Sequence, residues 1–152
     1  MRKRVFECPD QFKKIVFMDW LWYRYFNAGA VDKYKYGVEK VPQTLYSYMD
    51  GSRPGNYGKS WYYNVTTLYS PFFLVEKNHF VGLEINLVGS SIRVMDCNLG
   101  LYEDEEIVKE LEPIATLLPI LLKRTEKFSH LGSFDDNFTV VRDKTLPQDT
   151  LG

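Results

Sequence analysis

Residues 78–97 read NHFVGLEINLVGSSIRVMDC and decide the fold of this chain. Apolar side chains alternate with others on both sides of a Gly-Ser-Ser turn, a pattern that predicts two paired antiparallel strands. His79 begins the apolar face of the first strand, and Asp96 ends the apolar face of the second. Because antiparallel pairing brings those two strand ends together, we expect His79 and Asp96 to meet at one end of a hairpin.

Further strands and a long helix are predicted around the hairpin. Residues 65–69 are expected to form a strand that Pro71 ends, and residues 138–141 a last strand. The acidic residues 103–106 suit the positive end of a helix dipole and predict the start of a helix. Pro113 and Pro119 are expected to kink or divide that helix.

The N-terminal third contributes one predicted helix and one loop. Residues 10–27 place apolar side chains near helical spacing, which predicts a helix. Residues 51–59 contain three glycines and a proline and are expected to form a loop. The chain has 152 residues, of which 45% are apolar and 16% aromatic. This is enough to form the hydrophobic core of one domain, so we expect a single α+β domain over residues 1–152.

Composition and charge exclude several classes of function. The net charge of −1 gives no electrostatic case for nucleic-acid binding. The longest apolar stretch, residues 114–122, falls far short of the ~20 residues that span a bilayer, and no secretory signal is recognisable at the N-terminus. We therefore expect an intracellular protein of the nucleus or cytoplasm, without a membrane segment. Cys8 and Cys97 lack the spacing of a metal site, so no metal and no cofactor is expected.

Several segments from about residue 61 to the end resemble the ubiquitin-like-specific proteases. These are cysteine peptidases that process SUMO-type modifiers, and the likeness is to the divergent form abundant in plant genomes and transposons. The segments that carry it are Leu68-Tyr69-Ser70-Pro71, Asn78-His79-Phe80, Ile92-Arg93-Val94-Met95-Asp96-Cys97, Leu117-Leu118-Pro119-Ile120-Leu121-Leu122, Thr139-Val140-Val141-Arg142 and Leu146-Pro147-Gln148. The resemblance implies an α+β, papain-like (adenain-like) fold with a central antiparallel sheet flanked by helices.

The resemblance also assigns roles to four residues. His79 would be the general base that takes the thiol proton, Asp96 would orient its imidazole, and Gln148 would donate to the oxyanion. Phe80 stands where the family usually has a Trp that closes over the di-glycine tail of the modifier. Phe80 would then form one wall of a substrate-binding tunnel, and the equally weighted alternative is that it packs on the second face of the sheet.

The nucleophile is the main departure from the family pattern. In the family it follows the Gln within an Asp-Cys-Gly motif, whereas this sequence ends at Gly152. Cys97 is no substitute, because adjacent strand residues point to opposite faces and Cys97 would face away from Asp96. Cys8, outside the matched segments, is interpreted as a bystander. We therefore expect a catalytic domain that is incomplete at its C-terminus and inactive as this chain.

The function implied by the resemblance is hydrolysis after the di-glycine of a ubiquitin-like modifier, through a thioester. The expected partner is that modifier, of SUMO type, or its conjugates. Two alternatives remain: a non-catalytic module that binds the modifier, and a decayed, transposon-derived remnant. A third is an unrelated α+β protein in which the His/Asp pair is a coincidence, which would follow if His79 and Asp96 lay at opposite ends of the sheet.

Overall fold

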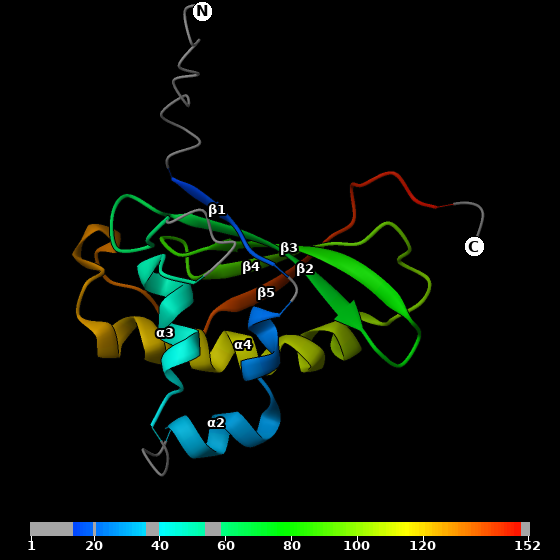
Figure 1. Cartoon of the computed structure of the whole chain (residues 1–152). Helices are drawn as coiled ribbons and strands as arrows, with labels where there is room; N and C mark the ends of the chain where they lie inside the picture. The colour runs from blue at the N-terminus through cyan, green and yellow to red at the C-terminus, as the bar shows by residue number, and fades with distance from the viewer. Residues whose placement is uncertain (1–13, 20, 36–39, 54–58, 150–152) are drawn as a thin grey trace, which may run out of the picture.

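The computed structural model of the chain describes residues 14–19, 21–35, 40–53 and 59–149. A sheet forms one layer, and helix α4 lies across one of its faces (Figure 1). Helix α2 packs against α4 on the side away from the sheet. The loop after strand β4 and the segment after strand β5 lie at the same end of the sheet.

The described residues contain five strands and three α-helices. The strands are β1 (Ile15–Phe17), β2 (Thr67–Leu74), β3 (His79–Asn86), β4 (Ser91–Met95) and β5 (Thr139–Asp143). The helices are α2 (Ala28–Lys35), α3 (Gln43–Asp50) and α4 (Asp104–Thr125), with short 3-10 turns η1 (Trp22–Tyr25) and η2 (Ser129–Leu131).

The sheet is mixed and follows chain order, β1-β2-β3-β4-β5. Its three central strands pair antiparallel, as predicted, and both edge strands pair parallel to their neighbours. Parallel neighbours need a crossover connection, which α4 supplies between β4 and β5. The α+β prediction is confirmed, and the antiparallel arrangement holds for the centre of the sheet.

The core lies between the sheet and α4. Alternate residues of β2, β3 and β4 face it, and α4 buries the complementary side along its length. The buried residues of these four elements are Leu68, Ser70, Phe72, Leu74, Val81, Leu83, Ile85, Ile92, Val94, Ile107, Leu111, Ile114, Ala115, Leu117, Leu118, Pro119, Leu121 and Leu122. Burying a leucine-sized side chain contributes about 1.5–3 kcal/mol, so this layer dominates the stability of the fold.

The prediction that Pro71 ends a strand is wrong, since β2 continues through it and Pro71 pairs with Gly82 of β3. The amide of Phe73, two residues on, points away from β3 and donates to the Tyr23 hydroxyl. Pro71 therefore lacks its N–H on the side that faces away from β3. β1 ends before this point, so β2 is an edge strand here, and an edge tolerates proline.

Pro113 and Pro119 do not divide the long helix, because α4 is continuous through both. That alternative of the prediction is wrong, and a kink at either proline stays a prediction. A helical residue 119 would donate its N–H to the carbonyl of Ala115, and proline cannot. The Ala115 carbonyl instead accepts the N–H of Phe138, at 2.9 Å, just before β5 begins. A tertiary hydrogen bond thus replaces the one that Pro119 removes from the helix.

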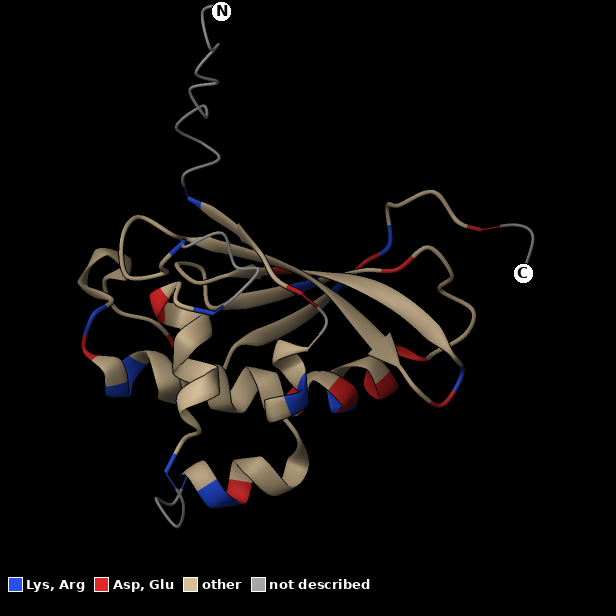
Figure 2. Cartoon of the chain, viewed as in Figure 1, with Lys and Arg blue, Asp and Glu red and all other residues tan. Residues whose placement is uncertain are grey.

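The ends of α4 follow their expected chemistry. Glu103 and Glu106 form a capping box at its N-terminus, and Glu103 donates its backbone N–H to Glu106 Oε1 at 3.0 Å. Acidic residues gather at this end, and Lys123 and Arg124 lie in the last turn (Figure 2). Both placements favour the helix dipole, so the predicted helix start is confirmed.

The predicted helix over residues 10–27 is wrong where the chain is described. Ile15–Phe17 form strand β1, which pairs parallel with the first residues of β2, and a 3-10 turn follows. The exposed edge of β2 and the β-branched residues Ile15 and Val16 favour a strand over the apparent helical spacing. Residues 10–13, residues 54–58 of the predicted loop, and Cys8 lie outside the described residues.

Candidate active site

His79 and Asp96 meet at the end of the β3–β4 hairpin, as the alternation predicts. His79 is the first residue of β3, and Asp96 follows Met95, the last residue of β4. The imidazole Nε2 lies 2.7 Å from Asp96 Oδ1. The side chain of Asp96 is fully buried and that of His79 is 13% exposed. The two therefore form a hydrogen-bonded pair whose imidazole borders on solvent, and they do not lie at opposite ends of the sheet.

Asp96 has partners on three sides. The backbone N–H of Asn98 donates to Oδ1 at 2.9 Å, and Arg142 Nη2 donates to Oδ2 at 2.7 Å. Burial raises the pKa of the Asp96 carboxyl, but hydrogen bonds from Arg142, His79 and Asn98 outweigh it and hold that pKa below its ordinary value. Asp96 is therefore ionised at neutral pH.

An ionised Asp96 determines which imidazole nitrogen of His79 carries the proton. A carboxylate can only accept hydrogen bonds, so Nε2, which faces it, must be the donor. In the neutral ring Nδ1 then holds the free lone pair. This is the arrangement of a general base held in one tautomer by a carboxylate.

Arg142 is a site residue that the analysis of the sequence missed. It lies in β5 opposite Val94 of β4, which places it on the buried face beside Asp96. Arg142 lies near Asp96 because β5 pairs parallel with β4, and the two strands are connected through the whole of α4. Local sequence patterns do not reveal a pairing between segments so far apart. The available signal was an arginine two residues after Val140, a spacing that places both side chains on the same face of a strand.

Gln148 lies beside the pair but is bound to the main chain. Its Nε2 donates to the carbonyls of Asp96, at 3.2 Å, and Leu146, at 3.1 Å, and its Oε1 accepts the N–H of Leu99. The side chain therefore fastens the segment after β5 to the loop after β4. To donate to an oxyanion, Gln148 would have to release one of these two carbonyls, and that role stays a prediction.

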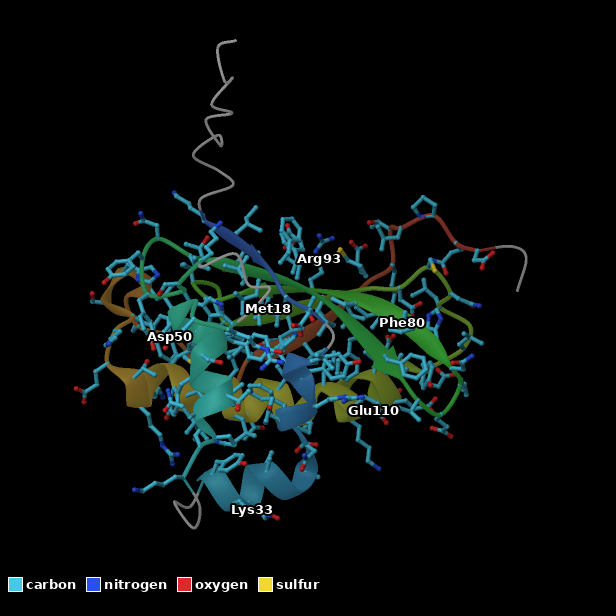
Figure 3. The ribbon with its side chains drawn as sticks, in the orientation of Figure 1. Met18, Lys33, Asp50, Phe80, Arg93 and Glu110 are labelled. Carbon is cyan, nitrogen blue, oxygen red and sulfur yellow. The ribbon has the colours of Figure 1, made fainter. Side chains whose placement is uncertain are left out.

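Phe80 lies on the opposite face of β3 from His79 and is 59% exposed. Its ring packs on Phe73, with centroids 4.5 Å apart. Figure 3 places it at the end of the sheet near the β2–β3 turn. A groove of about 520 Å³ lies here, lined by Tyr23, Arg24, Pro71, Phe73, Val75 and Phe80. Phe80 thus occupies the second face of the sheet, as one alternative expected, and also forms the wall of an open groove.

Cys97 is exposed, whereas its neighbour Asp96 is fully buried. Their side chains therefore point in opposite directions, as strand alternation predicts. The carbonyl of Cys97 accepts the N–H of Asp149 at 2.6 Å, a second tie between this loop and the C-terminal segment. Cys97 is thus not presented to His79.

The described part of the chain holds no cluster of three or more His, Cys, Asp or Glu side chains that could bind a metal ion. Among its helices, none combines the length and the apolar character needed to cross a membrane.

The sequence matches the model of the Ulp1 protease family, C-terminal catalytic domain, over residues 5–152. No curated protein matches the sequence. Among solved structures, the chain is similar to the C-terminal Ulp1 protease domain in complex with Smt3, the yeast ortholog of SUMO. The identity is 13% and the TM-score 0.43, over 90% of this chain and 49% of that one.

A second similar structure is the SUMO protease Ulp1 with its catalytic cysteine oxidised to a sulfinic acid. Here the identity is 9% and the TM-score 0.42, over 93% of this chain and 52% of that one. The chain thus spans about half the length of the solved structures that it matches.

Proposed function

The chain belongs to the Ulp1 protease family, through its C-terminal catalytic domain, and we propose that it carries part of a cysteine-peptidase site for ubiquitin-like modifiers. Its sheet and helices form the papain-like α+β fold of that family. The observation that carries the proposal is the buried pair of His79 and Asp96, 2.7 Å apart, with Nδ1 of the imidazole free to take a proton.

In the proposed chemistry His79 takes the proton of a cysteine thiol. The thiolate attacks the carbonyl of the second glycine of the di-glycine, the C–N bond after it breaks, and the amine leaves with the proton held by His79. Water then hydrolyses the thioester to a carboxylate and restores the thiol. Asp96 stabilises the imidazolium that forms, because a buried carboxylate next to a cation lowers its energy. Gln148 would donate to the oxyanion after releasing one of its two carbonyl partners.

We further propose that neither cysteine of the 152 residues supplies the thiol, and that this chain alone does not turn over substrate. The exposed, outward-facing Cys97 supports this proposal. The test is a SUMO substrate with a fluorogenic C-terminal amide. The 152-residue chain should release no fluorophore above the level of its Cys97→Ser variant. Release that Cys8→Ser or Cys97→Ser abolishes would identify a nucleophile and overturn this part of the proposal.

Binding of the modifier without hydrolysis is the second candidate function. The specific observation in its favour is the open groove bounded by Phe80 and Phe73, on the opposite face of β3 from His79. The His79 site itself holds a base but, among the described residues, no adjacent thiol. A tail of two glycines has no side chains and would fit beside such aromatic walls. The partner in this proposal is a SUMO-type modifier.

Titration of the ¹⁵N-labelled chain with SUMO and with ubiquitin tests the binding. We expect saturable shifts with SUMO, and a Phe80→Ala variant that binds at least about tenfold more weakly. Phe17→Ala is the matched control, because Phe17 is also an exposed aromatic residue, at 71%, but does not line the groove. Saturable binding to SUMO that Phe80→Ala leaves unchanged would reject the groove, and no binding to either modifier would reject both candidate functions.

A further inference from the structure

Arg142 connects β5 to the His79–Asp96 pair. Its Nη2 lies 2.7 Å from Asp96 Oδ2, and its side chain is only 6% exposed. His79 Nε2 and the Asn98 N–H lie on Oδ1 of Asp96, and Arg142 is the donor on Oδ2 among the described residues. The orientation of Asp96 therefore depends on Arg142 as much as on His79.

The same guanidinium holds the loop that carries Asp96. Nη2 also donates to the Leu99 carbonyl at 3.3 Å, while Nη1 donates to the Tyr102 carbonyl at 2.7 Å and to Asp104 Oδ1 at 3.1 Å. These bonds fasten the loop between β4 and α4 near its beginning and at its end. A planar guanidinium with several donors can make them together, and the single ammonium of a lysine cannot.

Stability alone does not account for this arrangement. A buried ion pair contributes little compared with apolar side chains of similar volume, because both charges lose their hydration. Arg142 Nε is in addition buried without a hydrogen-bond partner among the described residues. An unpaired donor in a buried arginine destabilises the fold, so stability does not explain an arginine at position 142.

Arg142 instead affects the protonation of Asp96. The groups that face its carboxylate among the described residues are the titratable His79 from β3 and the charged Arg142 from β5. Asp104 and Lys144 reach it only through Arg142. Without Arg142, one of the hydrogen bonds that oppose the effect of burial is lost, so the pKa of the Asp96 carboxyl should rise. A protonated Asp96 could donate to Nε2 of His79, which would place the ring proton on Nδ1 and remove the free lone pair there.

We propose that Arg142 is a positioning residue that keeps Asp96 a pure hydrogen-bond acceptor, and thereby holds His79 with its proton on Nε2 and its lone pair on Nδ1. The inference rests on the proposed role of His79 as general base. Its readout is the imidazole itself, which can be observed in the 152-residue chain without any modifier or thiol.

NMR of the labelled chain tests the inference. A proton on Nε2 that is hydrogen-bonded to a carboxylate should give a downfield resonance that exchanges slowly with water, and its absence from His79→Gln assigns it. In Arg142→Gln we expect this resonance to be lost to exchange. The pKa of the Asp96 carboxyl, followed by ¹³C shifts, should move to a higher value than in the natural chain. A resonance that persists in Arg142→Gln overturns the inference.

Arg93→Gln is the matched control. Arg93 lies on the neighbouring strand β4 and points to the sheet face away from α4 (Figure 3). It also binds two carboxylates, Glu84 at 2.8 Å and Asp143 at 2.5 Å. Arg93→Gln therefore removes a comparable set of ion pairs without touching His79, and the Nε2 resonance should persist. Its loss in this variant too would show that general loosening is the cause and would overturn the inference.

Arg142→Lys decides the matter if Arg142→Gln does not fold. The lysine keeps the charge, but its three donors cannot replace all four bonds of Arg142, to Asp96, Leu99, Tyr102 and Asp104. The Nε2 proton should therefore exchange faster than in the natural chain. Exchange at the natural rate contradicts the inference. None of these readouts involves SUMO binding or hydrolysis, so failure here and failure of the proposed function are observed separately.

Discussion

The indole N–H of Trp22 donates to the hydroxyl of Ser70 across 2.6 Å, inside the core. Trp22 belongs to η1, whose next residues, Tyr23 and Arg24, line the groove beside Phe80. Ser70 belongs to β2, and its hydroxyl donates a hydrogen bond to the Pro71 carbonyl. One buried polar contact thus fixes a wall of the groove to the sheet.

Ser70→Ala should destabilise the protein by about 1–3 kcal/mol, because it leaves the buried Trp22 N–H without an acceptor. Urea unfolding measures the loss. Ser133→Ala, at an exposed position, is the control and should change the free energy of unfolding by less than about 0.5 kcal/mol. Equal stabilities of the two variants would mean that the Trp22–Ser70 contact contributes nothing.

Asp96→Asn should cost about 3–5 kcal/mol, because it leaves the buried charge of Arg142 without its main counter-ion. Asp136→Asn removes a carboxylate that is 86% exposed and paired with Lys123, and should cost no more than about 1 kcal/mol. The comparison is made by denaturant unfolding of both variants. A loss for Asp96→Asn as small as that for Asp136→Asn would contradict the buried-pair interpretation.

Stability should fall in acid, partly through Asp96. The folded pKa of its carboxyl lies below the ordinary value of 3.8, because hydrogen bonds from Arg142 and His79 outweigh the effect of burial. The unfolded chain then binds more protons than the folded chain in this range, so stability rises with pH there. The contribution is complete above 3.8 and is lost as the pH falls through the lower folded value.

Unfolding free energies measured from pH 7 down to pH 3 check this expectation. Other carboxyls with lowered pKa, Glu84 and Asp143 among them, contribute to the same decline. The part that belongs to Asp96 is isolated by comparison with Asp96→Asn, whose curve should be flatter below about pH 4. Parallel curves for the two proteins would mean that Asp96 has the same pKa folded and unfolded.

The family, the fold class and the meeting of His79 with Asp96 could be predicted because each rests on local patterns. Strand alternation in β3 and β4 fixes which residues share a face, and a short turn leaves one antiparallel pairing. The predictions that failed concern Pro71, Pro113 and Pro119. The effect of Pro71 depends on whether a neighbouring strand needs its missing N–H. The effect of Pro119 depends on whether a distant N–H binds the helix carbonyl that it leaves free, and the local sequence carries neither piece of information.

Arg142 escaped prediction for a related reason. Its contact with Asp96 joins residues 46 positions apart, through a parallel pairing that forms only after α4 has crossed the sheet. The N-terminal segment shows the converse, because residues with apparent helical spacing were drawn into β1 by the edge of β2. The catalytic roles of His79, Asp96 and Gln148 remain predictions for the experiments above.

Pro119→Ala should loosen the start of β5. Alanine restores an N–H that can bind the Ala115 carbonyl within the helix, in competition with the N–H of Phe138. We expect faster hydrogen exchange at the Phe138 amide, with helix content unchanged or higher. Pro113→Ala is the control, and exchange at Phe138 should stay the same there. Equal exchange in both variants would mean that Pro119 has no part in holding β5.

The bond between Ala115 and Phe138 also bears on how the chain folds. A helix normally satisfies its own backbone, and can form before the rest of the protein. Here the centre of α4 has an acceptor that only a distant strand satisfies, and that strand carries Arg142 toward Asp96. The helix is therefore completed in the same cooperative step that brings Arg142 to Asp96. Partly folded molecules should contain neither a complete α4 nor the Arg142–Asp96 pair.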